Sequence, residues 1–104
     1  MTDFTIGETT RGGAVELKLA GDLDMSATFV LEPVLDRRLA DQPSELVLDL
    51  ERVSFVDSSG LSLLVGTHER AASAGVDMAI SGAGPDIQRV FHVAGLDGVL
   101  PVRS

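Results

Sequence analysis

Two adjacent serines carry the clearest potential chemistry of this chain, in the run Asp57-Ser58-Ser59-Gly60. The run follows a short apolar, β-favouring segment at residues 46–50 and precedes apolar residues at helical spacing, so it joins a predicted strand to a predicted helix. Asp and Ser oxygens at such a junction accept hydrogen bonds from the first free N–H groups of a helix. A serine hydroxyl there can also accept a phosphoryl group beside the positive end of the helix dipole. Residue types alone leave both interpretations open and favour capping, because capping serines are common.

Hydrolysis is another chemistry open to these serines. The nucleophile elbow has the form G-x-S-x-G, and around Ser58 the first glycine is replaced by Val56. His68 lies ten residues further along the same predicted helix. At 1.5 Å per residue that separation is about 15 Å, too far for His68 to act as the base. His92 is predicted near the far end of another helix, so we expect no enzyme activity.

A pair of carboxylates, Asp22 and Asp24, follows an earlier strand and suggests a metal site or an acid–base pair. No histidine or third carboxylate lies close by in the sequence to complete either site. The residues themselves therefore favour a loop in which both carboxylates are simply solvated, and we expect no metal and no cofactor.

Composition limits the remaining function classes. The 104 residues predict one domain, residues 1–104, and the absence of cysteine excludes disulfides and thiol chemistry. A net charge of -8, with four Phe and no Trp or Tyr, argues against binding nucleic acid. The start Met1-Thr2-Asp3-Phe4 has no basic region and no long apolar run follows, so we expect no signal peptide, no membrane span and a cytoplasmic location.

The first third of the chain predicts a hairpin followed by a helix. Residues 4–8 and 14–20 alternate around a turn at Gly12-Gly13, and residues 21–24 break the second strand. Ser26 is expected to cap a helix. Pro33 should kink that helix near Phe29 or mark its true start. The expected inward-facing residues of this helix are Phe29, Val30, Val34 and Leu35.

The remaining elements alternate between strands and helices. The central helix should stop at Gly75, before a strand over residues 76–80. Pro85 opens a further helix, with Leu96 free to fold back after Gly95, and residues 99–102 predict a last edge strand. The apolar stripe of that helix is Ile87, Val90, Phe91 and Ala94. This order predicts an α/β fold: a mostly parallel central sheet with an initial antiparallel hairpin, and helices packed on it.

Three segments together resemble the STAS domain, and in particular the bacterial anti-sigma factor antagonists that share it. They are Gly21-Asp22-Leu23-Asp24, the stretch from Leu46 through the Asp57-Ser58-Ser59-Gly60-Leu61 block, and Val90-Phe91-His92-Val93-Ala94-Gly95-Leu96. The likeness covers nearly the whole chain in the same order and spacing. It favours phosphorylation over simple capping, and it implies the STAS fold.

The resemblance implies a partner-switching protein. The unphosphorylated form would bind an anti-sigma factor that is also a serine kinase, and so release the sigma factor. Phosphorylation of Ser58 would end the binding, and a PP2C-type phosphatase would restore it. The implied partner-binding residues are Asp22, Asp24, Asp57, Ser58, Ser59, Gly60 and Leu61.

Three positions depart from the family pattern: Asp22 stands where Glu is usual, Ser62 stands where Gly is frequent, and Pro33 disturbs the first helix. They affect the contact surface more than the class. The same domain also occurs as an accessory subunit that binds the ATPase of a lipid transporter, and as a scaffold in sensory complexes. Neither of these roles requires phosphorylation.

Overall fold

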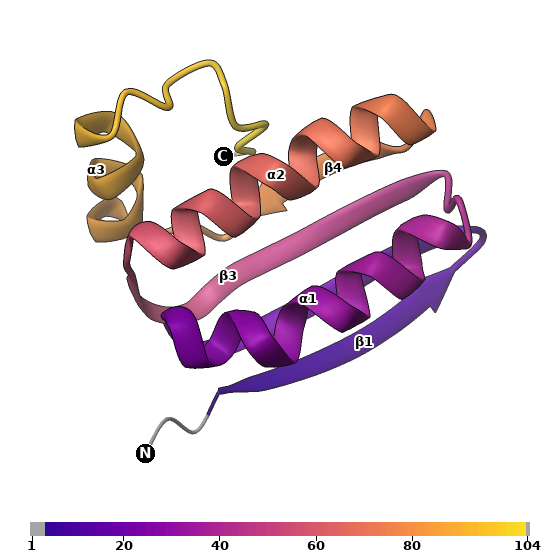
Figure 1. The fold of residues 1–104 in the computed structure, drawn as a ribbon, viewed down its shortest axis with the longest axis horizontal. Coiled ribbons are helices and arrows are strands. Elements are labelled where there is room, and N and C mark those ends of the chain that lie inside the picture. The colour runs from indigo at the N-terminus through magenta and orange to yellow at the C-terminus, as the bar shows by residue number, and fades with distance from the viewer. Residues whose placement is uncertain (1–3, 104) are drawn as a thin grey trace.

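Two helices, α1 (Met25–Ala40) and α2 (Ser58–Ala74), lie side by side across one face of a four-stranded sheet (Figure 1). The computed structural model describes residues 4–103. The expectation that residues 1–3 do not begin a signal peptide therefore lies outside the described residues. The strands are β1 (Thr5–Arg11), β2 (Ala14–Leu23), β3 (Glu45–Val56) and β4 (Asp77–Ser81), and a third helix, α3, spans Pro85–Val93. Within residues 4–103, no helix has the length and hydropathy needed to cross a membrane.

The sheet has the order β1-β2-β3-β4. The first pair is antiparallel, and the β2–β3 and β3–β4 pairs are parallel. This arrangement confirms the predicted α/β fold with its initial hairpin. Parallel pairing of β2 with β3 brings the carboxyl ends of these strands to the same edge of the sheet, where Leu23 is in register with Val56.

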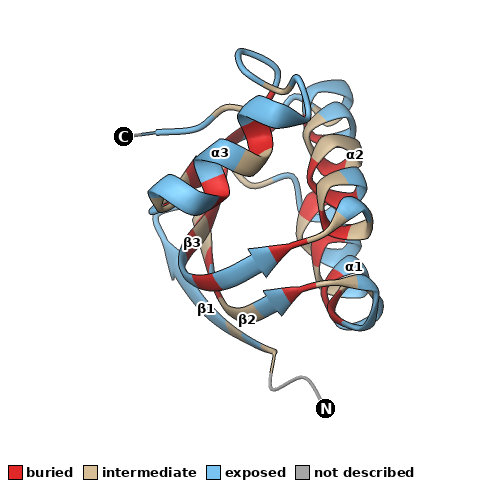
Figure 2. Ribbon diagram, turned by 90° about the vertical axis from the view of Figure 1, so that its left-hand side faces the viewer, coloured by how far each residue is buried: buried red, intermediate tan, exposed pale blue. Residues whose placement is uncertain are grey.

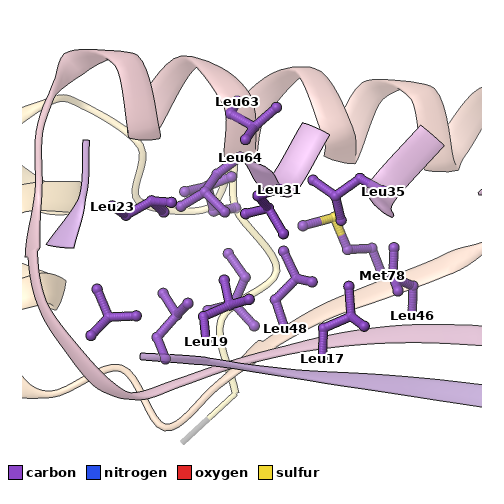
Figure 3. Close-up of a cluster of buried hydrophobic side chains, with 14 of the residues drawn as sticks. Leu17, Leu19, Leu23, Leu31, Leu35, Leu46, Leu48, Leu63, Leu64 and Met78 are labelled. Atoms are coloured by element: carbon purple, nitrogen blue, oxygen red, sulfur yellow. The ribbon is translucent and has the colours of Figure 1, made fainter. Parts of the chain in front are cut away.

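The buried residues, red in Figure 2, recur along α1, α2 and the strands. Leucine side chains fill the space between the sheet and the helices (Figure 3). Leu17, Leu19 and Leu48 rise from the sheet, while Leu31 and Leu64 descend from α1 and α2. All five are fully buried, and burying a leucine contributes about 2 kcal/mol relative to exposure. The helices are therefore held on the sheet mainly by apolar burial.

The inward face of α1 differs from the prediction. Its buried residues are Ala27, Leu31, Leu35 and Leu39, spaced four apart. Phe29 and Val30, predicted to face inward, are 74% and 53% exposed. Phe29 lies two residues and Val30 one residue before Leu31, so the rotation of the helix turns both side chains away from this stripe. The prediction for Leu35 is confirmed.

The start of α1 also differs. Asp24, and not Ser26, is the N-cap, since its carboxylate accepts a hydrogen bond of 3.0 Å from the N–H of Ala27. Pro33 lies inside the continuous helix, so a start at Pro33 is wrong. Proline has no N–H, so the carbonyl of Phe29 loses its helical hydrogen bond. Because Pro33 is exposed, this carbonyl lies on the side of the helix that is open to water.

The second strand runs further than the pattern predicts. Residues 21–23 were expected to break β2, but they continue it and pair with β3. Gly21 makes this possible with φ of +109°, and the register shifts between Gly21 and Asp22. The strand therefore delivers Leu23 and Asp24 directly to the start of α1.

The chain after α3 folds back as predicted. Ile87 and Phe91 are buried, while Ala94, expected on the same stripe, is exposed. The N–H of Leu96 donates to the carbonyl of Phe91 at 2.9 Å, a helix-ending bond that returns the chain toward the core. The predicted last strand shrinks to a single parallel bridge between Ile80 and Val102.

Two glycines of α2 have opposite surroundings. A Cβ added to Gly60 would lie 2.3 Å from the carbonyl oxygen of Leu23 and 2.9 Å from its Cγ. A Cβ added to Gly66 would meet nothing within 4 Å. The close approach at Gly60 seats the first turn of α2 against the end of β2, whereas the fold itself does not require a glycine at position 66.

We therefore expect Gly60→Ala to lower the free energy of unfolding by roughly 1–3 kcal/mol or more, because backbone must move to admit the methyl group. The matched control in the same helix, Gly66→Ala, should raise it by about 0.5–1 kcal/mol through helix propensity. Urea titration of the two variants measures both effects. A Gly60→Ala protein as stable as the parent, or a destabilised Gly66→Ala protein, would contradict the packing described here.

Candidate functional site

Two helices start side by side at the carboxyl ends of two paired strands (Figure 1). Leu23 ends β2 and Val56 ends β3, and each is followed by an aspartate. Asp57 caps α2 as Asp24 caps α1: its Oδ1 accepts a hydrogen bond of 3.0 Å from the N–H of Gly60. Of the residues whose oxygens could cap this helix, Asp57 is the cap, and the predicted capping by a serine hydroxyl is not what the structure shows, since Ser58 is already the first helical residue. The positive ends of two helix dipoles reach the same edge of the sheet.

A backbone hydrogen bond ties the two junctions together. The N–H of Asp57 donates to the carbonyl of Leu23 at 3.2 Å. The same carbonyl oxygen is the atom that a side chain at Gly60 would strike. The start of α2 is therefore fixed against β2 from two directions, which gives the next residue, Ser58, a defined position.

Ser58 is the first residue of α2 and its side chain is exposed. The first helical hydrogen bond runs from the N–H of Leu61 to the carbonyl of Asp57 at 2.9 Å. The N–H groups of Ser58 and Ser59 precede this bond, so they belong to the free donors of the helix end. The Ser58 hydroxyl is thus an accessible nucleophile beside the positive end of a helix.

Ser58 and Ser59 face different surfaces, because successive helical residues point about 100° apart. Ser58 lies in a shallow groove of about 450 Å³ between α2 and the chain after α3, called here the Ser58 groove. Its lining is Ser58, Leu61, Ser62, Val65, Gly66, Glu69, Ala94 and Leu96. Ser59 lies in a groove of about 350 Å³ between α1 and α2, the α1–α2 groove. Its lining is Thr28, Glu32, Ser59, Ser62, Leu63, Gly66, Thr67 and Arg70.

Asp22 stands apart from the other predicted site residues. It is exposed on β2 in register with Phe55, and its side chain leaves the strand opposite to that of buried Leu23. The structure brings Asp24, Asp57, Ser58, Ser59, Gly60 and Leu61 to the two helix starts. Asp22 lies one residue before the end of β2, on the other side of the sheet.

The sequence interpretation missed two groups of surface residues near the site. Met25 and Phe29 are 59% and 74% exposed on the first turns of α1. Measuring their positions against the four-residue spacing of the α1 leucines would have placed them outside. Val65 and Leu96 line the groove beside Ser58, and no local pattern links them because they are far apart in the chain.

Among the described residues, no hydrogen bond or ion pair joins either histidine to Ser58. His68 lies three turns along α2 and is half-buried, and the Nδ1 of His92 contacts the carboxylate of Asp97 on an exposed surface. Among residues 4–103, no three His, Asp or Glu side chains gather in a way that could hold a metal ion. What the site offers chemically is an exposed hydroxyl at the start of a helix.

Comparison with known proteins agrees with this geometry. A family model described as "Mlab, STAS domain" matches residues 6–101. The anti-sigma-B factor antagonist of Staphylococcus aureus is 33% identical over 102 residues, covering 98% of this chain and 94% of the relative. The anti-sigma-F factor antagonist RsfB of Mycobacterium tuberculosis is 31% identical over 94 residues, covering 90% and 76%.

Solved structures show the same architecture. A crystal structure of an anti-sigma factor antagonist from Mycobacterium paratuberculosis has a TM-score of 0.86 and 30% identity, over 96% of this chain and 85% of that one. Unphosphorylated SpoIIAA, an anti-sigma factor antagonist, shares the fold with a TM-score of 0.77 at 24% identity, over 97% and 88% of the two chains. With its family model spanning residues 6–101 and relatives above 30% identity covering at least 90% of it, this chain belongs to the STAS-domain family, among the anti-sigma factor antagonists.

Proposed function

We propose that this chain is an anti-sigma factor antagonist that acts by partner switching. In its unphosphorylated form it binds an anti-sigma factor with serine kinase activity and thereby frees a sigma factor in the cytoplasm. The kinase phosphorylates Ser58 and so ends the binding, and a PP2C-type phosphatase restores it. The chain is the substrate of these enzymes and no enzyme itself. The observation that carries the proposal is the exposed Ser58 hydroxyl at the first position of α2, at the edge where two helices begin.

The position of Ser58 suits phosphoryl transfer. The Oγ atom attacks the γ-phosphorus of ATP, the bond to the ADP oxygen breaks, and the hydroxyl proton passes to a base of the kinase. An exposed side chain at a helix start can enter a kinase site without unfolding of the strand that precedes it. Ser59 is half-buried in the α1–α2 groove, so it is the less accessible of the two hydroxyls.

The chain should keep its fold after phosphorylation. The phosphate adds a charge of about -1.5 to -2 at the N-terminus of α2. The helix dipole favours that charge by about 0.3–1 kcal/mol, while the carboxylate of the adjacent cap, Asp57, opposes it. These opposing effects leave a small net change in the stability of the free chain.

A docked partner would respond much more strongly. A phosphate buried in an interface without a matching cation costs several kcal/mol, and each 1.4 kcal/mol is about a tenfold change in affinity. Asp24 and Asp57 lie at the same edge and add negative charge there. Modification of one hydroxyl can therefore release a partner without a change in the shape of the chain.

A second candidate function is an accessory or scaffold subunit that binds an ATPase or a sensory complex without being phosphorylated. The matching family model is described by the name Mlab and not as an anti-sigma factor antagonist, which keeps this candidate open. The same exposed edge would then serve as a permanent docking surface.

Phosphorylation separates the two candidates. We expect a GHKL-type anti-sigma kinase from the source organism, incubated with ATP and the chain, to add one phosphate, which mass spectrometry of peptides locates at Ser58. A PP2C-type phosphatase should remove it. A Ser58→Ala variant treated in parallel is the control and should remain unmodified. Stable binding of the chain to a transport ATPase, with no kinase able to modify Ser58, would favour the accessory subunit instead.

Charge at Ser58 should affect binding and not folding. Ser58→Glu should weaken binding of the kinase by about 100-fold or more. Its unfolding free energy should change by less than about 1 kcal/mol, because the helix start tolerates an anion. Titration calorimetry and urea unfolding measure the two quantities.

The control for added charge is Ser73→Glu, at the exposed far end of the same helix, which should leave the affinity within about twofold. Ser58→Ala should bind like the parent chain but stay bound after ATP is added. Release of the Ser58→Ala protein by kinase and ATP would show that the switch lies elsewhere.

A further inference from the structure

The Ser58 groove presents apolar side chains directly beside the acceptor hydroxyl. Leu61 and Val65 of α2 and Leu96 beyond α3 pack on the core with one side and line the groove with the other, each only half-buried. Val93, the last residue of α3 and the residue before the lining Ala94, is a further apolar side chain that is 79% exposed. A partner that covers Ser58 covers the mouth of this groove as well.

The charge of the Ser58 groove is negative and lies at the end far from Ser58. Among the described residues that line it, Glu69 is the only charged one, and it lies eleven residues after Ser58 on α2, about 16 Å along the helix axis. No lysine or arginine of the part of the chain that the structure describes lines the groove to balance it, and the net charge of the full sequence is -8. The complementary surface is therefore apolar near Ser58 and cationic about three turns away.

The α1–α2 groove is a poorer match for an apolar partner. Its lining includes Glu32 and Arg70, and Arg70 is already paired with Asp36 across the two helices. Its apolar member, Leu63, is buried and offers little surface. Of the two grooves that flank the outer ridge of α2, the Ser58 groove leaves more unpartnered apolar surface.

We infer that an apolar segment of the anti-sigma kinase lies along the Ser58 groove, against Leu61, Val65 and Leu96, and places a lysine or arginine opposite Glu69. The inference rests on the proposed function and adds the path of the partner across the molecule. It also gives a physical reason for release. A phosphate on Ser58 would stand at the apolar end of this contact, far from the cation at the other end.

Two variants in the groove test this inference, each with a matched control outside it. Val65→Ser should weaken binding of the purified GHKL-type kinase by about tenfold, because an apolar contact is lost. Glu69→Lys should weaken it by about fivefold or more, with most of the change in the association rate and a reduced dependence on salt. The controls are Val30→Ser and Glu32→Lys, on exposed positions of α1, and both should bind within about twofold of the parent chain.

Urea unfolding of all four variants verifies that each is folded before its affinity is interpreted. Equal binding by the four variants, or a loss of binding confined to the α1 controls, would overturn the groove assignment. The proposed function would be unaffected by that result if Ser58 is still phosphorylated. If no kinase of this class binds the parent chain, the proposed function and the groove assignment both fall. Weakening confined to the two groove variants supports the inference.

Discussion

The close approach between Gly60 and the carbonyl of Leu23 is the constraint on which the rest of the site depends. A helix that follows a parallel strand can pack in several ways, but here its first turn touches the end of the neighbouring strand. The hydrogen bond from Asp57 to the same carbonyl holds that contact in place. Because β2 and β3 end in register, both helices also begin at the same level. Ser58 owes its exposure and its position to this packing.

Much of this arrangement could be predicted where local chemistry and fold agree. The change from a buried strand to helical spacing at Asp57 located the start of α2, and Gly75 located its end, where its left-handed conformation closes the helix. Pro85 likewise opened α3. These junctions depend on hydrogen bonds within a few residues, so residue types are sufficient to identify them.

The errors fall where distant packing decides. Ser26 and Asp24 are both good caps, and pairing of β2 with β3 beyond Gly21 selected Asp24 by carrying the strand two residues further. Phe29 was placed inside because it is apolar, yet four-residue spacing of leucines had already filled that face of α1. The groove beside Ser58 needs Leu96, whose place depends on the chain folding back after α3. No pattern within a single element contains that information.

Ser58 and Ser59 lie in different grooves, and this placement has a consequence for regulation. A kinase that modified Ser59 would place its phosphate in the groove shared with α1 and add no charge to the Ser58 groove. The two hydroxyls are neighbours in the chain but lie in different grooves of the molecular surface. Under the proposed function, the choice between two adjacent hydroxyls would thus decide which groove receives the phosphate, so a kinase would have to distinguish Ser58 from Ser59 and not merely recognise the loop.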